Sequence, residues 1–401
     1  MELLISAGQV LTGPAGDRIA DGAVLVEDDT IVAVGRRDEV AAQAGADRRE
    51  LDFPGATVLP GLIDCHVHLA FDASSAPIEA LQDSEEFSLL LGMAGRAQQL
   101  LDAGVTTTRD LGDRDGLAVH LRDAITQGSL AGPRILSATA PLTVRGGHCW
   151  FLGGEVDDEA EIRTMVRRNA RNGADLIKVM ATGGGMTKGG PATWEPQFSA
   201  AELKVVVQEA AEVGLRVAVH AHGTEGIANA VAAGVHTIEH CTWLAKDGFD
   251  VRPDVVDEIA AKGIFVCPGA SPNWRMLPKV FGEERSAAMF ERIRWMAERG
   301  VRLIAGTDAG VPRAVFNDFV GSLEFFSHLG FPADRVIEMA TVDAAEALGI
   351  QTETGRIAPG SQADLLVVDG DPRQDIGALR NSRLVLAAGR THLPVRTTIK
   401  T

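Results

Sequence analysis

The chain has no tyrosine among its 401 residues and only four cysteines. Without tyrosine, one common general acid and hydrogen-bond donor is missing from any active site. The four cysteines have no Cys-x-x-Cys spacing and are few for this length, which argues against a disulfide framework or a cysteine metal site. We therefore expect reduced thiols in a cytoplasmic protein.

Long apolar runs and an excess of basic residues are also missing. No stretch of about 18 apolar residues exists, so no transmembrane helix is expected. The N-terminus, MELLISAGQV, has neither a basic segment nor a long apolar core, so a secretory signal is not expected. The formal net charge of −17 argues against nucleic acid and anionic membranes as partners. A small-molecule substrate remains the expected partner.

The middle of the chain alternates between short apolar runs and amphipathic stretches. This pattern is typical of parallel strands joined by crossover helices, and eight such units predict a (β/α)8 barrel. An open doubly wound sheet is the alternative, but no G-x-G-x-x-G motif follows the first strand. The predicted barrel strands are 62–64, 105–109, 135–139, 176–180, 216–220, 237–240, 264–267 and 303–307. The main predicted helices are 85–102, 159–172, 200–213, 227–233, 255–262 and 283–299.

Both ends of the chain differ from the middle. Short β-rich runs punctuated by turn residues occur in the first 57 residues and again in the last fifty. The simplest explanation is that the two ends pair into one small domain. We therefore predict an α/β fold, a TIM barrel over 58–351, with a small β-sandwich domain built from 1–57 and 352–401.

Polar residues gather where the predicted barrel strands end, which is where such barrels place their active sites. The first strand runs into His66 and His68, and the fifth into His220 and His222. Because side chains alternate along a strand, each pair points to one face and can share a metal ion. His240 ends the sixth strand.

Two charged residues join these histidines at the strand ends. Asp308 follows the eighth strand, and Lys178 lies inside the apolar fourth strand. A buried lysine either pairs with a carboxylate or, with a depressed pKa, reacts with carbon dioxide to form a carbamate that can bridge two cations. Each residue alone has an ordinary structural explanation, but their convergence in one barrel indicates a shared site.

The motif Pro-Gly-Leu-Ile-Asp-Cys-His-Val-His at 60–68 resembles the opening motif of the amidohydrolase superfamily. The segments 104–112, 146–148, 177–184 and 237–240 are similar to its imidazolonepropionase-like branch, which includes Xaa-Pro dipeptidases, lysine/arginine carboxypeptidases and some xenobiotic amide hydrolases. The resemblance covers nearly the whole chain. It identifies the branch but not the substrate.

This resemblance implies a binuclear centre of two divalent metal ions, with zinc suited to the donors and manganese or cobalt as alternatives. One ion would be held by His66, His68 and Asp308, and the other by His220 and His240, with N-carboxylated Lys178 bridging them. Two such ions can share a hydroxide and polarise a substrate carbonyl. Asp308 would then act as general acid and base. Relatives often form oligomers, so a homo-oligomer is expected.

Four further residues are candidates for the substrate site. The resemblance makes His148 a catalytic contact to the substrate carbonyl or oxyanion, and His222, one pleat beyond His220, a substrate contact. Arg145 and Arg313 lie on loops after the third and eighth strands, where either could bind a substrate carboxylate in a bidentate manner. For each arginine, a solvated loop position is the alternative.

The predicted activity is hydrolysis of an amide bond in an N-acyl amino acid or dipeptide-like molecule. The same centre could instead hydrolyse a carbamate, a urea, a lactone or a xenobiotic amide. A mononuclear deaminase does not need the bridging residue, so Lys178 argues against it. A non-catalytic scaffold would have lost at least one ligand, and all six positions are filled.

Overall fold

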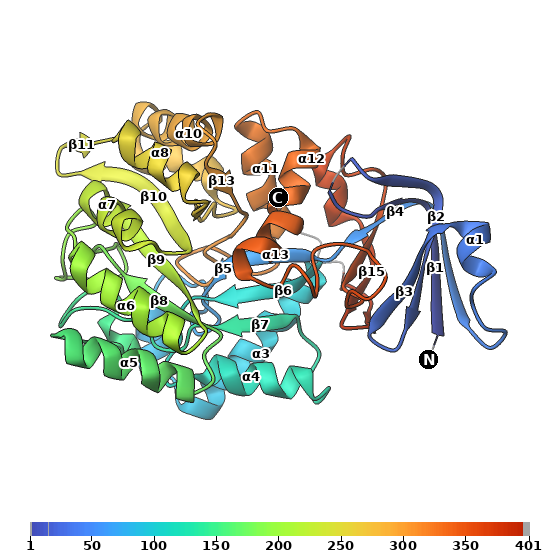
Figure 1. The fold of residues 1–401 in the computed structure, drawn as a ribbon, viewed down its shortest axis with the longest axis horizontal. Coiled ribbons are helices and arrows are strands. Elements are labelled where there is room, and N and C mark those ends of the chain that lie inside the picture. Colours follow the sequence, from blue (N-terminus) through green and yellow to red (C-terminus); the bar gives the residue numbers. More distant parts are fainter. Residues whose placement is uncertain (1, 15, 396–401) are drawn as a thin grey trace.

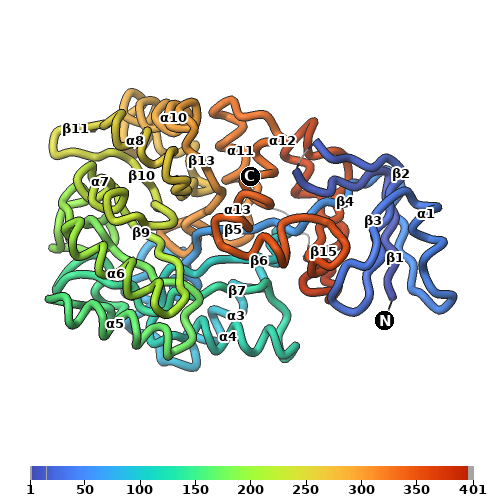
Figure 2. The backbone as a smooth tube through the Cα atoms, viewed as in Figure 1, coloured from blue at the N-terminus to red at the C-terminus, as the bar shows by residue number. Residues whose placement is uncertain are grey.

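The computed structural model describes residues 2–14 and 16–395. Positions 1, 15 and 396–401 of the predicted β domain lie outside this part. Figure 1 shows an α/β domain beside a β-rich domain that contains the N-terminal strands. In the tube view of Figure 2, the blue N-terminal segment and red C-terminal segment both run through the β-rich domain. Segments from both ends of the chain therefore lie in one domain, away from the helices around residues 160–210.

The β-rich domain is one seven-stranded sheet with strand order β16-β15-β14-β4-β1-β2-β3. Strand β4 joins the two chain ends, because it pairs parallel with β1 and antiparallel with β14. The strand pairing is continuous, whereas the predicted sandwich implied two separate sheets. The strands are β1 (Glu2–Leu11), β2 (Arg18–Glu27), β3 (Thr30–Arg36), β4 (Arg49–Pro60), β14 (Leu365–Asp369), β15 (Ser382–Ala387) and β16 (Arg390–His392).

The core of this domain combines residues from both ends of the chain. Ile5 and Val24 from the first strands pack in one buried cluster with Leu365 and Val367 from β14. Complete burial of each such side chain stabilises the fold by about 1.5–3 kcal/mol. The opposite face of β1 and β2 packs against Val40 of the short helix α1 (Arg37–Ala41).

The α/β domain contains parallel strands in two sheets, β5-β6-β7 and β13-β12-β10-β9-β8, with β11 attached to β10. Each of the eight predicted strands overlaps a strand of the structure. The strands are β5 (Leu62–Val67), β6 (Val105–Asp110), β7 (Arg134–Ser137), β8 (Leu176–Met180), β9 (Arg216–Gly223), β10 (Thr237–Ala245), β11 (Gly248–Phe249), β12 (Phe265–Cys267) and β13 (Arg302–Leu303).

Single bridges link the two parallel sheets at both of their edges. Leu142, after β7, pairs parallel with Val179 of β8, and Ala309, after β13, pairs parallel with Val67 of β5. Strand β13 is shorter than predicted, since only its first residues form a ladder with β12. The chain beyond β13 then follows β5 through separate hydrogen bonds, and it turns at Asp308, whose φ is 59°.

Helices alternate with the strands as the amphipathic pattern predicts. Their starts follow local capping rules: Ser199 and Glu202 form a reciprocal capping box on α6, and Asp158 caps α5. The helices are α2 (Pro77–Asp83), α3 (Glu86–Asp102), α4 (Leu117–Thr126), α5 (Glu159–Arg171), α6 (Ala200–Glu212), α7 (Thr224–Ala233), α8 (Pro253–Ala261), α9 (Leu277–Phe281), α10 (Glu283–Glu298), α11 (Phe319–His328), α12 (Ala333–Met339) and α13 (Val342–Leu348).

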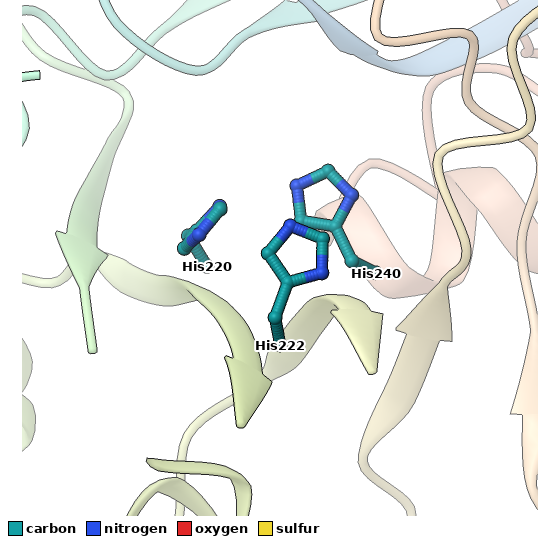
Figure 3. Close-up of side chains that lie close together, drawn as sticks. All are labelled: His220, His222 and His240. Atoms are coloured by element: carbon teal, nitrogen blue, oxygen red, sulfur yellow. The ribbon is translucent and has the colours of Figure 1, made fainter. Parts of the chain in front are cut away.

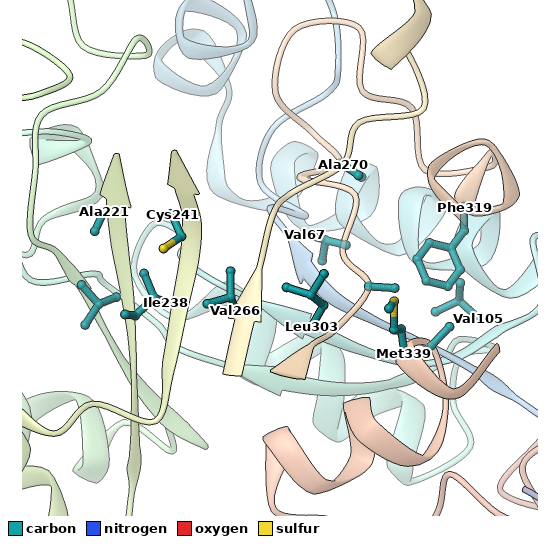
Figure 4. Close-up of a cluster of buried hydrophobic side chains, with 14 of the residues drawn as sticks. Val67, Val105, Ala221, Ile238, Cys241, Val266, Ala270, Leu303, Phe319 and Met339 are labelled. Carbon is teal, nitrogen blue, oxygen red and sulfur yellow. The ribbon is translucent and has the colours of Figure 1, made fainter. Parts of the chain in front are cut away.

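The main core lies between the parallel strands and these helices. Figure 4 shows Ile238, Val266 and Leu303 on neighbouring strands, with Phe319 and Met339 approaching from α11 and α12. Within the part of the chain that the structure describes, no helix combines the length and apolar character needed to cross a bilayer. The polar residues at the carboxyl ends of the strands line a common cavity.

Candidate metal centre and substrate cavity

His66 and His68 project from the end of β5 toward Asp308. The Nε2 atom of His66 lies 3.2 Å from Asp308 Oδ1, and that of His68 lies 3.5 Å from the same oxygen. Strand alternation puts both imidazoles on one face, as predicted, and the left-handed backbone at Asp308 turns its carboxylate toward them. Such a conformation is uncommon outside glycine and often marks a functional site. The three groups form a compact candidate metal site.

The other ring nitrogen of each imidazole faces an oxygen atom of a neighbouring strand or loop. Nδ1 of His66 lies 3.0 Å from Glu239 Oε2, and Nδ1 of His68 lies 3.3 Å from the carbonyl oxygen of Gly112. A carboxylate or carbonyl in this position fixes the tautomer and ring orientation of a metal-binding histidine. Both Nε2 atoms are therefore left to face Asp308.

Glu239 belongs to a buried charge network that the sequence analysis did not identify. Its side chain is fully buried and accepts hydrogen bonds from Arg109 Nη2 at 2.8 Å and Thr237 Oγ1 at 2.7 Å. Arg109 also donates to the carbonyl oxygen of Cys65 at 2.7 Å. Although burial opposes ionisation, Arg109 and His66 hold the pKa of Glu239 far below its usual range. The signal available in the sequence was that Arg109 and Glu239 are charged residues of opposite sign, each within a strand that is otherwise uncharged up to that point.

A second group of imidazoles comes from β9 and β10. His220, His222 and His240 offer nitrogen atoms that lie within 4.8 Å of one another. Figure 3 shows His222 and His240 lying face to face, with His220 to one side. The ring centroids of His222 and His240 are 4.4 Å apart and nearly parallel. Nδ1 of His222 lies 2.9 Å from Thr242 Oγ1, a contact that orients this ring.

The donor set fits a metal ion because most of the imidazoles are held neutral. Burial lowers the pKa of His68 and of His222 to about 4. Burial and the neighbouring histidines lower the pKa values of His220 and His240 well below the ordinary histidine value. Neutral imidazole is the form that binds metals. Burial opposes ionisation of Asp308, but His66 and His68 still bring its pKa far below the ordinary aspartate value.

Lys178 lies on β8, where only 1% of it is exposed, and it lines the same cavity as the histidines. Burial lowers the pKa of its amine to about 8, and the negative charges of Glu239 and Asp308 oppose that shift. A substantial neutral fraction therefore exists near neutral pH, which is the form that reacts with carbon dioxide. The carboxylation of Lys178 itself remains a prediction.

His148 follows β7 in a loop and lies beside the second histidine group. Its ring centroid is 4.6 Å from that of His220, and burial lowers its pKa to about 3. Gly184 makes room for this ring, because a Cβ atom there would lie 2.4 Å from the imidazole. Thr187 Oγ1, at 3.3 Å, is the partner of Nδ1. The uncharged ring can therefore offer a hydrogen bond to a substrate.

One cavity of about 500 Å³ brings these groups together. All six predicted ligands line it, as do His148 and His222. Its outer wall is largely apolar and includes Phe71, Trp274 and Phe290. The two remaining candidates lie elsewhere. Arg145 is exposed and pairs with Asp157, and Arg313 is an exposed residue whose backbone bonds to Ala73 and Asn273.

Comparison with known proteins agrees with this geometry. The sequence profile of the amidohydrolase family matches residues 57–391, and that of the bacterial imidazolonepropionase-like composite domain matches residues 22–45. Ochratoxinase of Aspergillus niger is 26% identical over 95% of this chain and 84% of its own length. Imidazolonepropionase of Symbiobacterium thermophilum is 27% identical over 91% and 90%.

Among solved structures, a Xaa-Pro dipeptidase with methionine bound in its active site is similar over 98% of this chain and 100% of its own. The TM-score of that match is 0.86 and the sequence identity is 30%. These similarities extend across both the β-rich and the α/β domain.

Proposed function

The chain belongs to the amidohydrolase family, and from this premise we propose that it hydrolyses an amide bond in an N-acyl amino acid or dipeptide-like small molecule. The observation that carries the proposal is the cavity in which the buried imidazoles, Lys178 and Asp308 converge. Buried polar groups are costly, and clusters of them with shifted pKa values are typical of functional sites.

Two divalent metal ions, most suitably zinc, complete this site in our proposal. His66, His68 and Asp308 would hold one ion, His220 and His240 would hold the other, and N-carboxylated Lys178 would contribute an oxygen ligand to each. Bound there, the ions supply an activated water nucleophile and polarise the substrate carbonyl. The fit is supported by the lowered pKa values of His68, His220 and His240 and by the oxygen atoms of Glu239 and Gly112 that lie behind His66 and His68.

Side chains of the protein perform the proton transfer and the contacts to the substrate. Asp308 is ionised at neutral pH, so its carboxylate can take the proton of the attacking water and pass it to the leaving amine. His148 donates a hydrogen bond to the substrate carbonyl oxygen as negative charge develops on it. His222 contacts the substrate from the side of the second histidine group.

The shape of the cavity supports an apolar group in the substrate. Phe71, Trp274 and Phe290 offer aromatic surface next to the histidines, and burying such surface is a main source of small-molecule affinity. The similar dipeptidase holds an amino acid, methionine, in its active site. Carbamates, ureas, lactones and xenobiotic amides remain the alternative substrates, since they need the same centre.

The geometry also supports a closed eight-stranded barrel over 58–351 as the scaffold. The single bridges Leu142 to Val179 and Val67 to Ala309 join the two parallel sheets at both edges. Closure would hold the ends of β5, β8, β9 and β10 around one opening.

A substrate screen tests the proposed function. Purified protein is loaded with zinc and bicarbonate and offered N-acyl amino acids and Xaa-amino acid dipeptides, together with ureas, carbamates and lactones. Release of a free amine from the first two classes, abolished in Asp308→Asn, is the expected result. Turnover confined to the other classes would replace the proposed substrate, and no turnover of any class would refute a hydrolase.

A further inference from the structure

Two glycine-rich segments meet beside His148. One is the loop after β8, residues 183–190, and the other is the loop after β7 that carries His148 itself. A Cβ atom at Gly184 would lie 2.4 Å from the His148 ring, and one at Gly147 would lie 2.6 Å from Gln197 Oε1. Glycine at these two positions therefore lets the segments pack closely enough to contact the histidine.

These contacts hold the backbone around His148 in place. The backbone N–H of His148 donates to Gln197 Oε1 at 2.7 Å. Gln197 Nε2 in turn donates to the carbonyl oxygen of Met180, at the end of β8. The backbone N–H of Cys149, the next residue, donates to Thr187 Oγ1 at 2.8 Å. His148 is thus attached both to β8 and to the glycine-rich loop that follows this strand.

The Thr187 hydroxyl connects this backbone contact to the imidazole. Its oxygen accepts the N–H of Cys149, so that hydrogen bond does not use the hydroxyl proton. Within residues 2–14 and 16–395, the other hydrogen-bond partner of this oxygen is Nδ1 of His148, at 3.3 Å. A hydroxyl has one proton to donate, and we therefore expect it to point at Nδ1.

We propose that Thr187 is a positioning residue that fixes the tautomer of His148, so that the ring proton is on Nε2. In an uncharged imidazole one nitrogen donates and the other accepts. A ring whose Nδ1 accepts the Thr187 proton has only Nε2 left to donate to a substrate carbonyl. This inference rests on the proposed amide hydrolase function, in which His148 makes that contact.

The opposite tautomer would leave the same groups less well paired. With the ring proton on Nδ1, the Thr187 oxygen would accept from both Nδ1 and the Cys149 N–H, and its own proton would lose Nδ1 as an acceptor. Nε2 would then face the Cys149 thiol, a weak donor whose sulfur lies 3.6 Å away. A ring in this state could offer no proton to a carbonyl oxygen, which is itself an acceptor.

The favoured tautomer gives the substrate a donor that is oriented in advance. Before the substrate binds, the proton on Nε2 faces the Cys149 sulfur, which is a weak acceptor. A carbonyl oxygen on which negative charge develops accepts more strongly, so the hydrogen bond gains strength during the reaction. Such an interaction raises the rate of the chemical step more than it raises substrate affinity. Loss of the Thr187 hydroxyl should therefore lower kcat and change KM little.

Nitrogen NMR of the histidine side chains tests the tautomer without substrate. The zinc-loaded protein carries isotope-labelled histidine, and two-bond proton–nitrogen correlation spectra separate protonated from unprotonated ring nitrogens. The His148→Asn variant identifies the His148 signals by their absence. The wild type should have a protonated Nε2 and an unprotonated Nδ1. Thr187→Val keeps the side-chain shape without the hydroxyl and should give a mixture of both tautomers, whereas Thr187→Ser should restore the wild-type spectrum.

Steady-state kinetics on an amide found in the substrate screen give a second readout. Thr187→Val should lower kcat by about 3- to 10-fold, as expected for loss of one hydrogen bond, and keep KM within about twofold. Thr187→Ser should recover most of kcat. The matched control is Thr193→Val. Thr193 is a half-buried threonine of the same connection between β8 and α6, and it is not among the hydrogen-bond partners of His148 within the described residues. This control should leave the spectrum and kcat unchanged.

Three results would overturn the proposal: a protonated Nδ1 on His148 in the wild type, an unchanged tautomer or kcat in Thr187→Val, or an equal loss in Thr193→Val. The spectra need no turnover, which separates this inference from the proposed function. An Nε2 tautomer that depends on Thr187, in a protein that hydrolyses no amide, would refute the reaction and retain the positioning role. Amide turnover with a tautomer that ignores Thr187 would do the reverse.

Discussion

Replacing Glu239 by glutamine tests the role of the buried carboxylate that lies between Arg109 and His66. The side chain keeps its shape but loses its charge, while Arg109 and His66 stay in place. Arg109 is 2% exposed and would remain buried beside a neutral amide. Nδ1 of His66 would lose the carboxylate that lies 3.0 Å away.

The expected effects follow from these two contacts. Removing one partner of a buried ion pair costs about 3–5 kcal/mol, and we expect about 3 kcal/mol because glutamine can still accept a hydrogen bond from Arg109. Loss of the group behind a metal-binding histidine weakens metal affinity by about 10- to 100-fold. Stability and metal binding should therefore fall together.

The depressed pKa of Glu239 also determines how its stabilising effect changes with pH. The pKa of Glu239 is depressed in the folded protein, so its stabilising effect is fully present above the ordinary glutamate pKa of about 4.3. It is lost progressively as the pH falls below that value, when the unfolded chain takes up the proton first. The part of the stability difference between wild type and Glu239→Gln that comes from Glu239 itself should be fully present above about pH 5 and should shrink below about pH 4.

Urea unfolding and competitive zinc titration measure the two effects, and Glu209→Gln is the control. Glu209 is equally buried but pairs with Arg163 and Arg167 on α5, away from the cavity. It should lose stability without losing zinc affinity. If Glu239→Gln keeps both its stability and its zinc affinity, or if the control loses zinc as well, the reasoning is wrong.

The remaining predictions concern individual side chains around the cavity. Lys178→Ala should lose bound metal and activity, measured by elemental analysis and turnover; two retained metals with full activity would refute the bridge. Because the pKa of Lys178 is about 8, its neutral fraction is about 1% at pH 6 and about 90% at pH 9, so reconstitution of stripped protein at a fixed concentration of dissolved carbon dioxide should be faster at pH 9. His222→Ala should raise KM more than it lowers metal content, and loss of one metal would instead make His222 a ligand. Arg145→Ala should keep KM within about twofold of the wild-type value, since this exposed side chain pairs with Asp157 outside the cavity. A larger change in KM would indicate that Arg145 contacts the substrate after all.

Much of the site could be predicted from the alternation of side chains along the strands. His66 and His68, like His220 and His222, sit two residues apart on strands, and alternation places each pair on one face. All of them line the cavity with Lys178, His240 and Asp308. The membership in the amidohydrolase family was also predictable, because its motifs lie in continuous segments of sequence.

The features that could not be predicted depend on contacts between distant segments. Glu239 lies next to His240 in the chain, but its role depends on Arg109, which is 130 positions away. Arg145 follows a strand end, yet the loop turns it toward Asp157 and solvent. Thr187 belongs to a glycine-rich loop, and nothing in that local pattern shows that it contacts His148, which is 39 positions away. Loop paths and the docking of strands set these positions, and both arise from tertiary packing.

Metal-dependent amide turnover is the most direct test of the central claim. The protein is stripped with a chelator and assayed on an N-acyl aromatic amino acid, then reloaded with zinc and bicarbonate while bound metal is measured by elemental analysis. The account predicts no turnover when stripped, and recovery in proportion to occupancy up to two ions per chain. Full turnover by metal-free protein, or two bound ions with no hydrolysis of any amide, would contradict it.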